Sequence, residues 1–366
     1  MNNHIVKCPA DHIALDFSFD RKLLDPVLSY LYNNSPLPED NLQFPVGTIT
    51  PDGRLDLCKQ QLGVSGIQLV TEALHQNTVI RHLLAGTNAF GDPGAAAIAG
   101  MVAVNRTLET LYMGCNYVTE VGCSAICESL EQNQSVKTVW FKRNPIGQSA
   151  AAIIKMLQQN PSVRTLDLVN TCMEADFTTL LRFLEQNTTV ERLYLSGNYL
   201  GADQMQPVSR MLAANRTLKA VFLSVNNIGD AGAGVLAAGL SQNTALEEIS
   251  LASCGIGTEG IARVLQALAG NNNLRIIDLG YAPSTRVLRS AANTIPNVAA
   301  IVNFIDRTTG LQYMNLVKTG LSAADKQQIL AAAAGKPGLH VLLERLETPK
   351  YFNAHPDSRA IKSVYR

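Results

Sequence analysis

The residues best suited to chemistry are a thiol and an imidazole near the start of the chain. Cys8 and His12 form the best nucleophile pair that can be assembled from seven cysteines and six scattered histidines. In a chain of 366 residues, two reactive residue types fall near one another by chance. The pair is therefore weak support for a catalytic function.

Two further cysteines lie four residues apart on a predicted helix. Cys123 and Cys127 would share one face of that helix, where two thiols can bind a metal or respond to an oxidant. No histidine or third cysteine accompanies them, so we expect both to be buried as small apolar residues. The odd number of cysteines and the lack of a CxxC pair indicate free thiols in a reducing compartment.

Motifs that bind nucleotides or activate water are missing from the sequence. There is no P-loop, no GxGxxG after a strand, no HExxH and no GxSxG. Gly-rich pieces such as 229–234 recur at a fixed position of an internal repeat, which indicates a packing role. We therefore expect no catalytic residue, no cofactor and no metal site.

An internal repeat of nearly constant length organises most of the chain. Three segments, 106–116, 188–198 and 216–226, share the pattern L-x-x-L-x-L-x-x-N. The first apolar position of the pattern recurs, with steps of 28, 28, 28, 27, 27, 28, 28 and 28, at Asp52 (a weak start), Ile80, Leu108, Val136, Val163, Val190, Leu218, Leu246 and Leu274. A 37-residue step then leads to Leu311, and Leu339 follows after a step of the ordinary length. The long step predicts an irregular repeat between Gly280 and Gly310.

An asparagine lies three residues before each of the eight apolar positions from Ile80 to Leu274, at Asn77, Asn105, Asn133, Asn160, Asn187, Asn215, Asn243 and Asn271. Over about 290 of the 366 residues the pattern resembles leucine-rich repeats of the long, ribonuclease-inhibitor type. This resemblance implies an α/β leucine-rich-repeat solenoid, a horseshoe with a parallel concave sheet and helices on the convex side. Four glycosylation sequons coincide with the asparagine position, so we interpret them as structural; they are Asn105, Asn133, Asn187 and Asn215.

The chemistry of the repeat agrees with this fold. Leu108, Leu111 and Met113 alternate as expected for one face of a strand, and the amide of Asn116 can satisfy backbone groups where the chain leaves the strand. Leu236 and Leu240 have the spacing of a helix that lies on the repeat core. Small Ala and Gly residues would let neighbouring helices approach closely. One repeat cannot bury its own apolar face, so stacking supplies the stability and the ends need caps.

We predict four parts along the chain. Residues 1–50 form a helical cap and a Pro-rich loop, with apolar residues at helical spacing at Leu23, Leu24, Val27, Leu28 and Leu31. Residues 51–283 form leucine-rich repeats, and residues 284–346 form the irregular repeat and the C-terminal repeats or cap. Residues 347–366 form a mildly basic tail, either poorly ordered or a short helix. The repeats are expected to form one continuous right-handed solenoid.

Side chains at one strand position should face the concave side of the horseshoe. From Tyr112 to Phe222, four of the five residues at this position are aromatic, and one is the single tryptophan, Trp140. Exposed Tyr and Trp side chains serve as anchors in protein interfaces. The predicted partner-binding residues are Tyr112, Trp140, Tyr194, Phe222, Lys142, Arg143, Asp167 and Arg192. The alternative is that the rings only cover neighbouring strands.

Composition excludes several other classes of function. The chain has 30 basic and 30 acidic residues, and Asp56, Asp167 and Asp278 share the aromatic stripe, which argues against a nucleic-acid groove. The longest weakly polar stretch, 95–104, is half of the ~20 residues that a membrane helix needs. The segment from Met1 to Asp20 contains no apolar block of signal-peptide length. We expect a cytosolic protein, monomeric when free, with no nucleic-acid or membrane partner.

The expected function is non-catalytic binding of a partner protein on the concave face. Junctions such as Gln-Asn-Thr-Thr resemble those of leucine-rich-repeat effectors from intracellular bacteria such as Legionella. This resemblance implies a protein made in the bacterial cytosol and translocated into the host cytosol, where it regulates or inhibits a host protein or another effector. The alternative is an enzyme, or a regulatory subunit of one, in which the horseshoe only presents a substrate.

Overall fold

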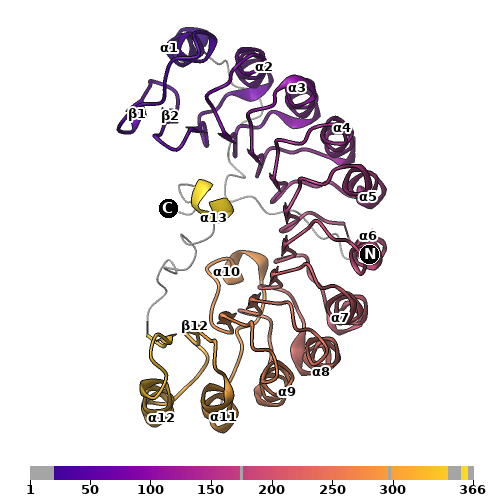
Figure 1. The fold of residues 1–366 in the computed structure, drawn as a ribbon, viewed down its shortest axis with the longest axis vertical. Coiled ribbons are helices and arrows are strands. Elements are labelled where there is room, and N and C mark those ends of the chain that lie inside the picture. Colours follow the sequence, from indigo (N-terminus) through magenta and orange to yellow (C-terminus); the bar gives the residue numbers. More distant parts are fainter. Residues whose placement is uncertain (1–19, 174–175, 296–297, 345–355, 362–366) are drawn as a thin grey trace. The chain divides into compact units, whose positions relative to one another are not determined.

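The computed structural model describes residues 20–173, 176–295, 298–344 and 356–361. The chain divides into two compact units, and each is described by itself. Unit 1 comprises Met1–Asp176 together with Pro349–Arg366, and unit 2 comprises Phe177–Thr348. In both units short strands alternate with helices, and the helices of the regular repeats lie on one side of the strands (Figure 1). We call the opposite side of the strands the concave surface of each unit.

Unit 1 begins with a helix and a β-hairpin and continues with strand–helix repeats. Its described elements are α1 (Arg21–Tyr32), β1 (Leu42–Gln43), β2 (Thr48–Ile49), β3 (Arg54–Asp56), α2 (Gly63–Leu74), β4 (His82–Leu84), α3 (Gly91–Val104), β5 (Thr110–Tyr112), α4 (Glu120–Leu130), β6 (Thr138–Trp140), α5 (Ala150–Gln159), β7 (Thr165–Asp167) and α13 (Pro356–Ala360).

Unit 2 carries the same alternation and the irregular repeat. Its described elements are α6 (Asp176–Leu184), β8 (Arg192–Tyr194), the 3-10 helix η1 (Ala202–Gln204), α7 (Met205–Ala214), β9 (Ala220–Phe222), α8 (Gly229–Leu240), β10 (Glu248–Ser250), α9 (Thr258–Leu268), β11 (Ile276–Asp278), α10 (Thr285–Leu288), α11 (Ala299–Arg307), β12 (Tyr313–Asn315), α12 (Ala323–Ala334) and β13 (His340–Leu342).

The repeat strands pair in parallel with their neighbours in the sequence. In unit 1, β3 to β7 form a parallel run, and in unit 2, β8 to β13 form another. Each strand has three residues, and the same repeat position is aligned from strand to strand. These observations confirm the predicted fold class, an α/β leucine-rich-repeat solenoid.

The start of the chain differs in one respect from the predicted cap. The helix appears as α1, with Leu24, Val27, Leu28 and Leu31 buried, while Leu23 is 47% exposed. The segment predicted as a Pro-rich loop contains the hairpin β1–β2, which pairs antiparallel with β3. Its tight turn is closed by the bond from Phe44 N to Gly47 O at 3.0 Å, and Gly47 has a φ of 87° that favours glycine. The hairpin was not predicted because the prolines of this segment are typical of a loop.

Two sets of buried asparagines connect successive repeats. The Asn116 amide nitrogen donates to the carbonyl oxygens of Ala85 and Met113 at 3.0 and 2.9 Å, as its predicted role requires. The Asn105 amide nitrogen donates to Leu74 O at 2.7 Å, and its oxygen accepts from Leu108 N at 2.9 Å. The four sequon asparagines are all at most 9% exposed, which agrees with a structural role.

The helices are packed closely through small residues. At Gly239 of α8, a Cβ atom would come within 2.1 Å of the carbonyl oxygen of Ser209 on α7. No side chain larger than hydrogen fits there, so this glycine sets the helix spacing. The prediction that small residues permit close approach of neighbouring helices is confirmed at this contact.

The irregular repeat lies where the long sequence step predicts it. β11 ends at Asp278 and β12 begins at Tyr313, and the segment between them contains α10 and α11. At the position of the repeat asparagine, the Cys254 thiol donates to Leu223 O at 3.2 Å. Asn293, in the extra segment, accepts from the backbone N–H of Cys254 and donates to Leu251 O. The insertion thus supplies the amide that the next repeat lacks.

The four predicted parts of the chain and the continuity of one solenoid remain predictions. Within the predicted tail, the structure describes α13 and Ile361, and the rest of residues 347–366 lies outside the described residues.

Candidate functional site

The residues predicted to face the concave side are the last residues of their strands. In unit 1, Tyr112, Trp140 and Asp167 are aligned on neighbouring strands β5, β6 and β7. In unit 2, Tyr194 on β8 is aligned with Phe222 on β9. The structure therefore brings the predicted residues together as two clusters, one in each unit.

The unit 1 cluster contains a pair of contacting rings. The centroids of Tyr112 and Trp140 lie 6.3 Å apart, with the ring planes at 41°. Cβ atoms placed at Gly86 and Gly114 would come within 2.5 and 2.7 Å of the Tyr112 side chain, so this ring packs closely beside both glycines. The Trp140 indole nitrogen donates to Thr138 Oγ1 at 3.3 Å.

The expectation that these rings are exposed is wrong. Trp140 is 0% exposed, Tyr112 4% and Tyr194 5%. The repeat pattern gives the direction of a side chain, whereas coverage depends on neighbours, and large rings on strands ~4.8 Å apart contact one another. Phe222 is the one predicted aromatic residue that remains partly exposed.

Asp167 carries the most unusual carboxyl group of the unit 1 cluster. Its side chain is fully buried, Oδ1 accepts a hydrogen bond from Val169 N at 2.9 Å, and Oδ2 has no hydrogen-bond partner. Burial raises the pKa of Asp167 to about 6, although Lys142 nearby acts to lower it. Burial also lowers the pKa of Lys142, and Asp167 opposes that effect. Lys142 and Arg143 follow β6 after one residue, the buried Phe141, and are half-buried.

The unit 2 cluster is built on a buried ion pair that spans two repeats. Arg192 Nη2 on β8 lies 2.8 Å from Glu248 Oε2 on β10, and the two side chains are 8% and 6% exposed. Ala220 occupies the matching position on the intervening strand β9, where its small side chain leaves room for the guanidinium. The pair is therefore permitted by the small residue between its two strands.

Aromatic rings cover the guanidinium of Arg192. Tyr194 and Phe222 are stacked, with centroids 4.0 Å apart and planes at 5°. The Arg192 Cζ atom lies 5.9 and 5.3 Å from these two centroids, within the range of cation–π attraction.

Burial and ion pairing oppose each other in this cluster. Burial alone would lower the pKa of Arg192, but the adjacent Tyr194 and Glu248 outweigh it and raise that pKa. Burial raises the pKa of Glu248, and Arg192 opposes the increase. Arg192 Nε is buried without a hydrogen-bond partner. The cluster is a charged, aromatic surface whose hydrogen bonds are incompletely satisfied.

A polar group beside the unit 2 cluster was not among the predicted site residues. Ser250 Oγ donates to Asp278 Oδ2 at 3.2 Å, and burial raises the pKa of Asp278 to about 6. Arg54, the first residue of β3, is also a buried concave residue and is 5% exposed. Arg54 could have been predicted from the sequence, because it occupies the first position of its strand, as Arg192 and Glu248 do in theirs.

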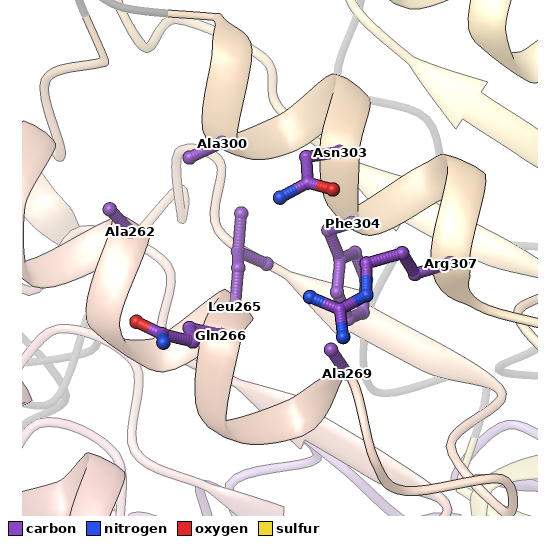
Figure 2. A pocket seen from close by; sticks show the side chains of 8 residues that line it. All are labelled: Ala262, Leu265, Gln266, Ala269, Ala300, Asn303, Phe304 and Arg307. Carbon is purple, nitrogen blue, oxygen red and sulfur yellow. The ribbon is translucent and has the colours of Figure 1, made fainter.

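A pocket of about 310 Å³ lies between α9 and α11, away from the strand positions. Leu265 and Phe304 line it together with alanines, and Asn303 and Arg307 are exposed at its side (Figure 2). Helix α9 precedes the irregular repeat and α11 lies within it, so β11 and α10 separate the two helices in sequence. The pocket contains none of the predicted site residues.

Chemically reactive groups elsewhere have structural surroundings. Six cysteines within the described ranges are free thiols, and Cys123 and Cys127 are buried as predicted. Burial raises the pKa of Cys254 to about 12. Cys8 and His12 lie outside the described residues. In the part of the chain that the structure describes, no three His, Cys, Asp or Glu residues are grouped to hold a metal ion.

A membrane-spanning helix is not found among the described residues, because none of their helices is both long and apolar enough.

A family model described as a leucine-rich repeat matches residues 104–127, 214–237 and 242–264. These three segments are leucine-rich repeats. The matched ranges contain β5, β9 and β10 and most of the helices that follow these strands, α4, α8 and α9.

Three solved structures that are similar to the chain share little sequence with it. Actin-binding site 2 of leiomodin-1 is 23% identical, covers 45% of this chain and 89% of its own, and has a TM-score of 0.38. The yeast Rad7 and Elc1 complex is 14% identical in sequence, and the match covers 78% of this chain and 72% of the other chain with a TM-score of 0.48. The tropomodulin C-terminal domain of Caenorhabditis elegans is 15% identical, and the match covers 45% of this chain and 92% of that domain with a TM-score of 0.35. No curated protein sequence matches the chain significantly.

Proposed function

We propose that the chain is a non-catalytic protein-binding module that contacts its partner through the concave strand surfaces. The observation that carries this proposal is that one aromatic ring and two cations at or near concave strand positions are partly exposed. Phe222 is the last residue of β9, and Lys142 and Arg143 follow Phe141 after β6. Aromatic and arginine side chains that a partner covers contribute much of the binding energy in protein interfaces.

The proposed site residues differ in how they contribute. Phe222, Lys142 and Arg143 are partly exposed, so they contact the partner directly in this proposal. Asp167 and Arg192 are buried, so in this proposal they act through the neighbouring side chains of Lys142 and Phe222. The buried rings hold these groups in place, and they are Tyr112, Trp140 and Tyr194.

We further propose that the protein is a monomeric effector that is made in the bacterial cytosol and translocated into a host cytosol. The resemblance of its repeat junctions to those of bacterial effectors supports this, and the free thiols agree with a reducing compartment. In that setting the module regulates or inhibits a host protein or another effector. A reporter enzyme fused to the full chain tests translocation: host-cell signal that depends on the secretion system is expected, and equal signal without it contradicts the proposal.

The binding proposal is tested by affinity with matched variants. The full chain captures partners from host lysate and from a library of bacterial effectors, and the dissociation constant of each purified candidate is then measured. Phe222→Ala removes a partly exposed concave ring, whereas Leu330→Ala removes a 52% exposed side chain on α12 of the same unit. We expect about thirtyfold weaker binding for Phe222→Ala, equivalent to ~2 kcal/mol, and no change for Leu330→Ala. The reverse ranking would place the interface on the helices.

A further inference from the structure

The short helix α13 returns to the beginning of the repeats. It belongs to unit 1, although it lies far from β3 in the sequence, and Figure 1 shows it on the strand side of that unit rather than among its helices. Arg54 Nη1 on β3 donates to the carbonyl oxygen of Ala360, the last residue of α13, at 3.4 Å. The chain thus folds its own C-terminal segment onto the concave surface of unit 1.

Burial at this contact involves both partners. Ala360 is 3% exposed, and Ile361, which follows it, is 0% exposed, whereas Pro356 and Arg359 at the other positions of α13 are exposed. A five-residue helix alone cannot bury an isoleucine, so burial of Ile361 requires other parts of the chain. Burial of this aliphatic side chain away from water favours the docked segment. The segment is therefore anchored by one apolar residue and one polar contact.

Arg54 is suited to hold a helix end. Its side chain is 5% exposed, and it is aligned with His82 on β4 at the first position of the strands. The last carbonyl groups of a helix lack partners within the helix, and an arginine can donate to them. Arg54 Nε has no hydrogen-bond partner, so the guanidinium is not saturated by the contact with Ala360.

We propose that residues 356–361 are an intramolecular ligand of the concave surface of unit 1. The surface accepts a short helix whose final carbonyl group faces Arg54 and whose next residue is a buried aliphatic one. The regulatory consequence rests on the proposed function: a partner that uses the β3 end of unit 1 must displace this segment first. The docked segment then weakens the apparent affinity of such a partner for that end of unit 1.

Trypsin cleavage of the full chain tests the docking without any partner. Trypsin cuts after Arg359 only when the following residues leave the surface and become extended. We expect the Arg359–Ala360 bond to be cut at least tenfold more slowly in the chain than in a synthetic peptide of residues 349–366. Arg54→Met preserves the cleavage sequence and should accelerate the cut severalfold. The control Lys219→Met, at an exposed ion pair of unit 2, should leave the rate unchanged.

A second variant keeps the test decisive if Arg54→Met perturbs folding. Ile361→Asp changes only the tail, and its cleavage rate should equal that of the matching Asp-containing peptide. The same variant, with its tail released, should bind the fluorescent wild-type peptide 349–366 at least tenfold more tightly than the wild-type chain does. Cleavage of the wild-type chain at the rate of the peptide, or equal peptide binding by both chains, would overturn the proposal. Neither result bears on partner affinity, so the binding proposal succeeds or fails separately.

Discussion

Replacing Arg192 by methionine should destabilise the protein strongly, because the change leaves Glu248 buried without its cation. The pair is 2.8 Å apart, and the two side chains are only 8% and 6% exposed. Removing one member of such a pair typically costs ~3–5 kcal/mol. Loss of the cation–π contacts with Tyr194 and Phe222 adds ~0.5–2 kcal/mol. We therefore expect a total loss of about 5 kcal/mol for unit 2.

The assay is urea denaturation followed by far-ultraviolet circular dichroism, with two comparison variants. Lys219→Met removes a cation from an ion pair of 3.5 Å whose side chains are 42% and 47% exposed, so it should cost less than ~1 kcal/mol. The double variant Arg192→Met with Glu248→Leu replaces the buried pair by apolar groups and should recover most of the lost stability. Low pH should also rescue Arg192→Met, because burial raises the pKa of Glu248 and protonation neutralises it.

Two results would refute this reasoning. One is a cost for Arg192→Met no larger than that for Lys219→Met. The other is a double variant as unstable as the single one. Either result would mean that the buried charge of Glu248 is compensated by groups other than Arg192.

Three further predictions follow from other parts of the fold. Burial raises the pKa of Asp167 to about 6 from 3.8, so the folded chain binds more protons than the unfolded chain between these values, and stability falls as pH rises. Asp167→Asn should therefore stabilise the protein at pH 7 relative to pH 4, by up to about 3 kcal/mol in urea denaturation. Trp140→Ala should cost ~3–5 kcal/mol, and Trp140 emission in the free protein should be blue-shifted and resist quenching by iodide. Asn293→Ala should cost ~2–3 kcal/mol in thermal melts, because it leaves buried backbone groups of the irregular repeat unsatisfied.

Each of these predictions has an outcome that contradicts it. Ser322 lowers the pKa of the exposed capping carboxylate Asp325, so the effect of Asp325→Asn on stability should have the opposite pH dependence to that of Asp167→Asn. If the effects of both substitutions change with pH in the same direction, the reasoning about Asp167 is wrong. A red-shifted, readily quenched Trp140 would restore the expectation of an exposed ring. A melting temperature for Asn293→Ala equal to that of the wild type would mean that the insertion supplies no structural amide.

The repeat positions were predictable because a few residues specify them locally. Asn116 bonds to carbonyl groups of its own repeat and the preceding one, so a single asparagine marks both the strand exit and the stacking contact. The nearly constant step of the repeat leaves room for one strand and one helix, which fixes the order of elements. The hairpin β1–β2 escaped prediction because two-residue strands carry no alternating pattern.

The candidate site was predictable in position and not in environment. The pattern placed Tyr112 and Trp140 on adjacent strands, but ring contacts and glycine gaps determine how far they are covered. The pair Arg192–Glu248 spans 56 residues, and its formation depends on a small residue at Ala220 between them. Docking of Ile361 has no periodic signal, because the tail lies outside the repeats.

The central claim, that a protein partner binds the concave strand surface, is tested most directly by site-specific photo-crosslinking in the full chain. A benzoyl-phenylalanine residue replaces Phe222 in one protein and the exposed Leu330 of α12 in another, and each is irradiated with the purified partner. If the partner binds the concave surface, a covalent adduct should form from position 222 and none from position 330. An adduct from position 330 alone would contradict the account and assign the interface to the helices.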